Sequence, residues 1–214
     1  MFDFTLWDIA RNLLLAMRWT IALSLIAFVG GGLVGALLVV LRLTGNRFVR
    51  GLVMLYVQLF QGTPLLLQLF LVYFGFSMFG LETTPLVAAS VCLTLYASAY
   101  LTEIWRGGIE SIERGQWEAS SSLALTFGEQ MRYVILPQAV RVGIAPTVGF
   151  MVQVVKATAL TSVIGFVEMT RAGQIITNAT FQPFLTYGSV ALMYFALCFP
   201  LSWYSRVLEQ KLRR

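Results

Sequence analysis

The sequence predicts an all-α integral membrane protein with five transmembrane helices. Hydrophobic residues occupy 58% of its 214 positions, charged residues only 12%, and the mean hydropathy is +0.78. Soluble domains carry about 25% charged residues, so this composition excludes an ordinary soluble fold. The apolar residues form long runs rather than alternating segments of about ten residues, which excludes an outer-membrane β-barrel.

Five apolar runs are long enough to cross the hydrocarbon core, which requires about 20 residues in a helix. We expect the transmembrane helices at about Thr20–Leu41, Leu52–Met78, Pro85–Ile104, Val142–Val167 and Phe184–Tyr204. The first run contains GGGLVGALL, whose small residues allow a second helix to approach closely. Before it, apolar residues recur at helical spacing from Leu6 to Met17, so residues 4–18 are predicted to form a short helix in the membrane interface.

Lysine and arginine are distributed unequally between the two sets of connections, and this predicts the orientation in the membrane. Eleven fall in one set: Arg42, Arg47, Arg50, Arg106, Arg114, Arg132, Arg141, Arg206, Lys211, Arg213 and Arg214. Three fall in the other set: Arg11, Arg18 and Arg171. The positive-inside rule places the first set in the cytoplasm, with the amino terminus outside and the carboxyl terminus inside. The same rule accounts for the net charge of +5 without a nucleic-acid partner.

Several kinds of chemistry are excluded by the residues that the sequence lacks. It contains no histidine, and both Cys92 and Cys198 lie in apolar runs, so neither an imidazole metal site nor a disulfide framework is expected. The pattern G-x-x-x-x-G-K-[ST] does not occur, so the chain has no phosphate-binding loop for ATP. Without paired carboxylates or an activated serine, an enzyme is also a poor interpretation.

One cytoplasmic connection is unusually long and amphipathic. The stretch GQWEASSSLALTFGEQMRYVILPQA, from Gly115 to Ala139, combines charged residues with apolar residues at partly helical spacing. Connections in helical bundles usually have about 2–8 residues. A surface that packs against another protein is therefore a better interpretation of this stretch than a solvated linker.

This stretch resembles the EAA loop in the permease subunits of ATP-binding-cassette (ABC) importers. The motif reads E-A-A, three residues, G, nine residues, I-x-L-P, and its spacing is kept by Glu118, Ala119, Ser120, Ala124, Val134, Leu136 and Pro137. Ala124 replaces the glycine, and we expect it to stiffen the bend that glycine permits. The blocks GTPLLLQLFLVYFG, YLTEIWRGGIESIERGQWEA, LPQAVR and VKATALTSVIG are similar to the polar amino-acid branch of that family.

The resemblance implies a single permease domain over 1–214 with the type I ABC importer fold, in the bacterial inner membrane. Its cytoplasmic coupling loop would cover about 107–141. The implied partners are a second permease subunit, identical or homologous, two cytoplasmic ATP-binding subunits and an extracytoplasmic amino-acid-binding protein. ATP and Mg would bind to the ATPase, and no cofactor to this chain. The ATPase-coupling residues would be Glu118, Ala119, Ser120, Ala124, Leu136 and Pro137, with Glu118 as a positioned charge rather than a catalytic acid.

Lys156 is the outstanding polar residue in the predicted membrane region. It lies near the middle of the fourth predicted helix, where a charge costs at least ~2.5 kcal/mol and marks a functional candidate. Gln153 precedes it by three residues, so both side chains are expected to point into the bundle. Two interpretations remain open: the ammonium attracts a substrate carboxylate, or it bonds to backbone carbonyls at a helix break. The resemblance adds Thr158, and a cation without an adjacent acid favours acidic or neutral amino acids as substrates.

The second predicted helix supplies further candidates for the substrate pathway, namely Gln61, Thr63 and Gln68. Gly62-Thr63-Pro64 interrupts this helix, and broken helices with free backbone groups often form substrate sites. Glu103 is also a candidate, but Arg106 lies beside it at the inner end of the third helix. An ion pair that holds the bundle together is the preferred interpretation of Glu103.

An ion-coupled secondary amino-acid transporter is the main alternative from another class. It predicts an internal inverted repeat and buried carboxylates, and the sequence patterns indicate neither. A channel subunit predicts a ring of pore charges, for which Lys156 alone is weak support. The permease interpretation is therefore favoured.

Overall fold

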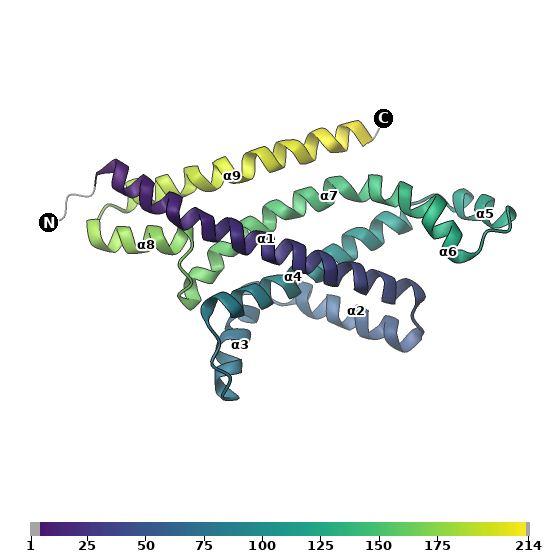
Figure 1. The fold of residues 1–214 in the computed structure, drawn as a ribbon, viewed down its shortest axis with the longest axis horizontal. Helices are drawn as coiled ribbons and strands as arrows, with labels where there is room; N and C mark the ends of the chain where they lie inside the picture. The colour runs from purple at the N-terminus through teal and green to yellow at the C-terminus, as the bar shows by residue number, and fades with distance from the viewer. Residues whose placement is uncertain (1–4, 213–214) are drawn as a thin grey trace.

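A computed structural model of the chain describes residues 5–212, which form an elongated bundle of helices (Figure 1). The α-helices are α1 Leu6–Thr44, α2 Arg47–Gly62, α3 Leu65–Met78, α4 Pro85–Glu110, α5 Arg114–Ser122, α6 Phe127–Glu129, α7 Leu136–Ala157, α8 Met169–Thr180 and α9 Pro183–Leu212. A π-helix, Gln130–Ile135, joins α6 to α7, and a 3₁₀-helix, Thr158–Ile164, follows α7. The described residues contain no strand, which confirms the predicted fold class.

Four helical segments between residues 5 and 212 are long and apolar enough to cross a membrane: α1, α4, the run Phe127–Ile164 and α9. The pair α2 and α3 gives a fifth span if it is counted as one broken segment, since the two helices bend by 104° at the break. Five spans were expected, and so was the interruption at Gly62-Thr63-Pro64. The proline explains it, because Pro64 has no amide hydrogen to continue the hydrogen bonding of α2.

The separate amino-terminal helix predicted over 4–18 is not observed. Residue 4 lies outside the described residues, and the rest of that segment continues without a break into the first span as the 39-residue helix α1. Thr5 and Asp8 form a capping box at its start, with the Asp8 amide donating to the Thr5 hydroxyl over 3.2 Å. Ile9 and Leu13 are buried in a cluster with residues of α8 and α9. This packing explains why the segment extends the bundle as one helix with the first span.

The fourth predicted span, Val142–Val167, is shifted in the structure. The helix α7 already begins at Leu136 and ends at Ala157. The chain then tightens into the 3₁₀-helix, where the Thr158 hydroxyl donates to a carbonyl three residues earlier, and it turns at Gly165 with φ +87°. Lys156 therefore lies in the last turn of α7 rather than near the middle of a span.

The sequence patterns did not predict α8, which has only 12 residues and lies beside the amino-terminal half of α1. The backbone amide of Met169 donates to the Thr20 hydroxyl over 3.3 Å, so the two helices are joined at the start of α8.

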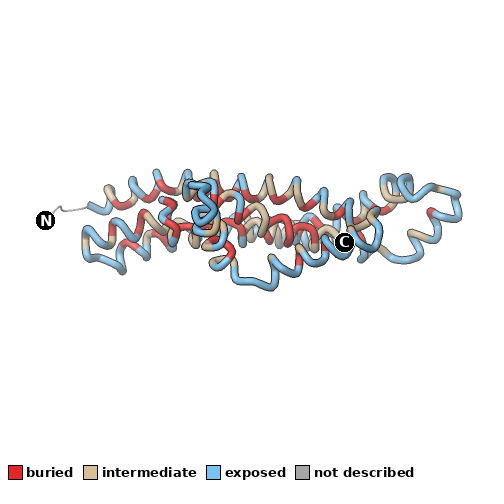
Figure 2. The backbone as a smooth tube through the Cα atoms, turned by 90° about the horizontal axis from the view of Figure 1, so that it is seen from below, coloured by how far each residue is buried: buried red, intermediate tan, exposed pale blue. Residues whose placement is uncertain are grey.

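The helix α4 occupies the centre of the bundle and packs closely along α1. A Cβ atom at Gly31 would lie 2.5 Å from the Cβ of Ala97, so only glycine permits this approach. Leu23, Leu93 and Phe150, from α1, α4 and α7, belong to the largest buried cluster. Figure 2 shows buried residues along the length of the bundle, whereas the end that carries α5 and α6 is mostly exposed.

Candidate functional site

The segment between α4 and α7 forms two short helices at the end of the molecule opposite the amino terminus (Figure 1). The rings of Trp117 and Phe127 stack with centroids 6.4 Å apart, which holds α5 against α6. Trp117 also packs on a cluster that contains Ile109 of α4 and Ile135 of the π-helix. The loop is therefore a folded unit attached to α4 and α7. The segment predicted over 107–141 includes the ends of these two helices, and from here on we use the name coupling loop for residues 111–135 alone.

Most of the predicted coupling residues are exposed, either on this loop or at the start of α7. The side chain of Glu118 is 66% exposed, and its carboxylate accepts a hydrogen bond from Arg114 over 2.9 Å. Ala119, Leu136 and Pro137 are also exposed. Ser120 differs, because it is buried and its hydroxyl donates to the carbonyl of Trp117 over 2.9 Å. Its side chain stabilises α5 rather than presenting a surface to a partner.

Ala124 has a left-handed backbone conformation, with φ +57°. It follows the end of α5, where its amide donates to the carbonyl of Ser121 over 2.9 Å. A left-handed conformation costs a residue with a Cβ atom about 1–2 kcal/mol, and glycine avoids that cost. Glycine, which the motif has at this position, would adopt the same turn without that cost. The left-handed conformation of Ala124 is thus a local strain in the bend, and the expected stiffening of the bend stays a prediction.

The Leu136-Pro137 pair opens α7 directly after the π-helix Gln130–Ile135. Pro137 cannot donate a backbone hydrogen bond, and in an α-helix its ring would crowd the carbonyl of Tyr133 four residues earlier. A π-helix is wider and pairs residues five apart, which moves this carbonyl away from the ring. The proline thus fixes a wide turn between the coupling loop and α7.

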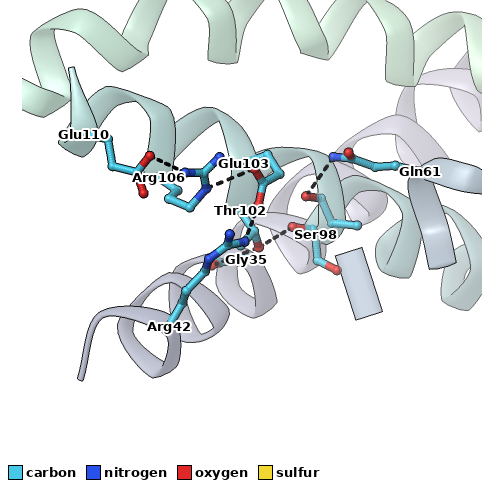
Figure 3. Close-up of polar contacts among 9 residues, drawn as sticks. Gly35, Arg42, Gln61, Ser98, Thr102, Glu103, Arg106 and Glu110 are labelled. Carbon is cyan, nitrogen blue, oxygen red and sulfur yellow. Dashed lines mark hydrogen bonds and ion pairs between the residues drawn. The ribbon is translucent and has the colours of Figure 1, made fainter. Parts of the chain in front are cut away.

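Glu103 lies in an ionic cluster where α1 and α4 meet (Figure 3). Its carboxylate pairs with Arg42 over 2.5 Å and with Arg106 over 2.6 Å, and Arg106 also pairs with Glu110. Glu103 thus forms the expected ion pair with Arg106, while its part in a substrate pathway stays a prediction. Arg106 was expected as its partner, but Arg42 was not, because only the packing of α1 on α4 brings the two residues together.

Gln68 is buried at the break between α2 and α3. Its Nε2 donates to the carbonyls of Phe60 and Thr63 over 2.9 and 3.0 Å and to the Thr63 hydroxyl over 2.8 Å. Gln61 is exposed, and its Nε2 lies 3.4 Å from the carbonyl of Ala99 in α4 (Figure 3). Gln68 and Thr63 thus fix the bend itself, while Gln61 ties α2 to α4.

Lys156 and Gln153 are exposed on the surface of this chain, so they do not point into its interior as expected. Thr158 is fully buried, and its hydroxyl donates to the carbonyl of Val155 over 2.8 Å. Among the hydrogen bonds within residues 5–212, none joins Lys156 to Gln61 or Gln68. The structure therefore separates an exposed pair on α7 from the glutamines of the broken helix.

Glu168 is a buried acid that the sequence patterns did not identify. It precedes α8, and its carboxylate accepts hydrogen bonds over 2.8 Å from the amides of Thr170 and Arg171 and from the Tyr194 hydroxyl of α9. Burial raises the pKa of Glu168, and these donors oppose the shift. An acid directly before a helix is a recognisable N-cap signal in the sequence. The burial of Glu168 depends on its packing against α9, and no local sequence pattern indicates that packing.

Residues 27–214 match a protein family described as "Binding-protein-dependent transport system inner membrane component". The chain is 33% identical to the probable amino-acid ABC transporter permease YckA of Bacillus subtilis, over 90% of this chain and 85% of that protein. It is 32% identical to the glutamine transport system permease GlnP of Escherichia coli K12, over 99% and 98% of the two chains.

Two kinds of solved structure are similar to this chain. One, described as an amino acid ABC transporter with histidines, has a TM-score of 0.90 at 31% identity and covers 94% of both chains. An inward-facing MetNI methionine ABC transporter has a TM-score of 0.77, covering 94% of this chain and 97% of that chain. At 22% identity, the second structure supports the fold alone.

Proposed function

Because this chain belongs to the family of inner membrane components of binding-protein-dependent transport systems and has the fold of an ABC importer permease, we propose that it imports polar amino acids with energy from ATP. The observation that carries this proposal is the exposed coupling loop, which keeps the EAA spacing at one end of the bundle. The relatives named as amino-acid and glutamine permeases support the substrate class.

The coupling loop is proposed to dock on a cytoplasmic ATPase. Glu118 offers an exposed carboxylate, which accepts charge-assisted hydrogen bonds from a partner. Leu123 and Phe127 offer exposed apolar side chains on the same loop. ATP and Mg would bind to the ATPase, since this chain has no phosphate-binding loop. Movement of the ATPases would reach the membrane through α7, which continues directly from the π-helix.

The complete importer would contain two permease subunits, identical or homologous, two ATPases and an extracytoplasmic amino-acid-binding protein. We place the amino terminus outside and the carboxyl terminus in the cytoplasm, because eleven basic residues against three lie on the side of the coupling loop. The ATPase then meets the loop on the side where ATP is available.

The substrate pathway is proposed to lie between the two permease subunits. Lys156 and Gln153 are exposed on this chain, and a cation facing lipid is expensive, so a second subunit should cover this face of α7. The ammonium would attract the carboxylate of the substrate as it passes. A cation without a neighbouring acid favours acidic or neutral amino acids over arginine and lysine.

Reconstitution of the importer with Glu118→Lys tests the docking role. We expect substrate-stimulated ATP hydrolysis and uptake to fall together, because the reversed charge repels the donors on the ATPase. Glu113→Lys is the matched control, since Glu113 is exposed just before α5 and lies outside the motif. Unaltered coupling in Glu118→Lys would contradict the proposal, and a panel of labelled amino acids in the same vesicles would identify the substrate.

A further inference from the structure

An apolar groove of about 540 Å³ lies between α1, α4 and α7. Val40 of α1 and Val140 of α7 line it and are each 54% exposed, and Trp105 of α4 lies between them in the lining. The indole N–H of Trp105 donates to the Thr147 hydroxyl over 3.0 Å, and this hydroxyl donates to the carbonyl of Gly143 over 2.7 Å. The polar groups of the wall are already bonded, so the groove offers an apolar surface.

The groove runs along α7 and is long enough to hold an acyl chain across one membrane leaflet. Its lining includes Leu136, at the loop end of α7, and Met151, which lies fifteen residues further along the same helix. This separation corresponds to about 22 Å of α-helix, compared with a hydrocarbon depth of about 15 Å for one leaflet. An acyl chain that enters from the cytoplasmic side can therefore lie along α7 within the groove.

The groove also lies on the side of α7 away from the proposed substrate pathway. Thr147 lines the groove, whereas Lys156, nine residues later, is about two and a half turns away and lies on the opposite side of the helix. On that opposite side α7 packs against α9, where Ser205 donates to the carbonyl of Ala145, and the proposed function assigns the exposed Lys156 end to the second subunit. The groove side is then the side of α7 left to the bilayer.

Arg132 provides a positive charge near the cytoplasmic end of this groove. It is exposed, it precedes Leu136 by four residues, and its guanidinium lies 5.6 Å from the ring centroid of Tyr133. None of the ion pairs within residues 5–212 includes it. A cation four residues before the first groove residue on α7, together with an apolar lining, matches the phosphate and the acyl chain of an anionic lipid.

We infer that this groove binds one anionic phospholipid of the cytoplasmic leaflet. The acyl chain lies against Val40 and Val140, and the phosphate lies at Arg132. The inference rests on the proposed function for its orientation in the membrane. The lipid would thus lie beside α7, the helix through which the movement of the ATPase is proposed to reach the membrane.

The assembled importer in phosphatidylcholine vesicles allows a direct test with Trp105 as the probe. Phosphatidylglycerol brominated on its acyl chains quenches nearby tryptophans, and the difference between the natural chain and Trp105→Phe isolates the signal of Trp105. Matched vesicles carry the bromine on phosphatidylcholine at the same mole fraction. We expect stronger quenching of Trp105 by the brominated phosphatidylglycerol.

Two pairs of variants sharpen this test. Arg132→Gln should weaken the preference for the anionic lipid about fivefold, the effect of one basic residue at a lipid surface. Ala36→Phe places a ring in the groove and should reduce the quenching by both lipids. The controls, Arg47→Gln and Leu37→Phe, change exposed residues of α2 and α1 outside the groove and should leave the quenching unchanged.

Equal quenching by both lipids, unaffected by Arg132→Gln, would overturn the inference because Trp105 would then contact only bulk lipid. Protection of Trp105 from both lipids would also overturn it, because a protein would then cover the groove. ATP-dependent uptake by the same vesicles measures the proposed function separately. Uptake without a lipid preference would thus reject the lipid site and leave the importer function in place.

Discussion

The left-handed conformation of Ala124 gives the coupling loop a local point of strain. With φ +57°, its Cβ atom crowds the neighbouring backbone, and this conformation costs about 1–2 kcal/mol. The carbonyl of Ser121 nonetheless accepts a hydrogen bond from its amide over 2.9 Å, so the turn is held in place. The turn lets the chain reverse between α5 and α6. With glycine at this position, the same turn would form without this cost in conformational free energy.

Ala124→Gly should therefore raise the free energy of unfolding by about 1 kcal/mol. Ala119→Gly is the matched control, because Ala119 lies within α5, where glycine should lower stability by about 1 kcal/mol. Thermal unfolding of the two variants in the same detergent measures the contrast. If both substitutions lowered the free energy of unfolding equally, the assignment of a left-handed conformation to residue 124 would be wrong.

The positions of single functional residues were only partly predictable from the sequence. The coupling residues were placed on an exposed loop because the spacing from Glu118 to Pro137 is a local property. The predicted inward orientation of Lys156 was wrong, because its exposure depends on where α7 ends and on which helices cover it. The ion pair between Glu103 and Arg42 was missed for a similar reason, because 61 residues separate the two in sequence.

The cap of α8 joins three helices through one buried carboxylate. Glu168 accepts hydrogen bonds from two amides of α8 and from Tyr194 of α9, while the neighbouring Met169 amide donates to Thr20 of α1. The acid therefore fixes a helix of only 12 residues, which is too short to be stable alone.

We expect Glu168 to make stability depend on pH. Burial raises its pKa, so the folded protein holds the proton more tightly than the unfolded chain, in which the pKa of Glu is about 4.3. The stabilising contribution is fully present below about pH 4.3 and is lost as the pH rises through the raised folded pKa. Thermal unfolding between pH 4 and 8 should show this fall in the natural chain and not in Glu168→Gln.

The exposed acid Glu113 provides the control for this pH dependence. Glu113→Gln removes a carboxylate without changing the cap, so its unfolding temperature should follow that of the natural chain at every pH. Parallel curves for the natural chain and Glu168→Gln would contradict the assignment of the pH dependence to Glu168.

Close packing of α1 on α4 depends on glycine at one position. A Cβ at Gly31 would lie 2.5 Å from the Cβ of Ala97, so Gly31→Ala forces the helices apart and should cost about 1–3 kcal/mol. Gly32→Ala is the neighbouring control, because the nearest atom to its new Cβ would be 3.8 Å away. Thermal unfolding of both variants in detergent should show a lower free energy of unfolding only for Gly31→Ala.

The long helices were predictable because a membrane span needs a long apolar run, and the small-residue pattern at residues 30–38 indicated a close helix contact. The continuity of α1 was not predictable, since the amino-terminal residues are amphipathic and only α8 and α9 decide where they pack. The helix α8 is short and mixed in character, so its sequence resembles a connection. The bend of 104° between α2 and α3 is larger than the proline alone could indicate.

Continuous helical structure connects the coupling loop to the exposed polar pair on α7. The coupling loop packs on α4 near Ile109 and continues through the π-helix into α7, which carries Gln153 and Lys156 near its far end. Under the proposed function, a rotation of the loop would therefore be transmitted along α7 to the exposed polar pair. The wide turn before Pro137 connects the loop to α7, so we expect a change in this turn to alter the transmission.

Pro137→Ala tests that transmission. Alanine restores an amide that can donate to the carbonyl of Tyr133, so the π-helix can close as an α-helix and shift the loop relative to α7. We expect folding to be retained and uptake per ATP hydrolysed to fall roughly two- to thirtyfold, the range of about 0.5–2 kcal/mol for residues that connect two sites. Pro85→Ala, at the start of α4 and far from the loop, should leave the ratio unchanged. An unchanged ratio in Pro137→Ala would mean that the force reaches α7 by another route, through the contacts of the loop with α4.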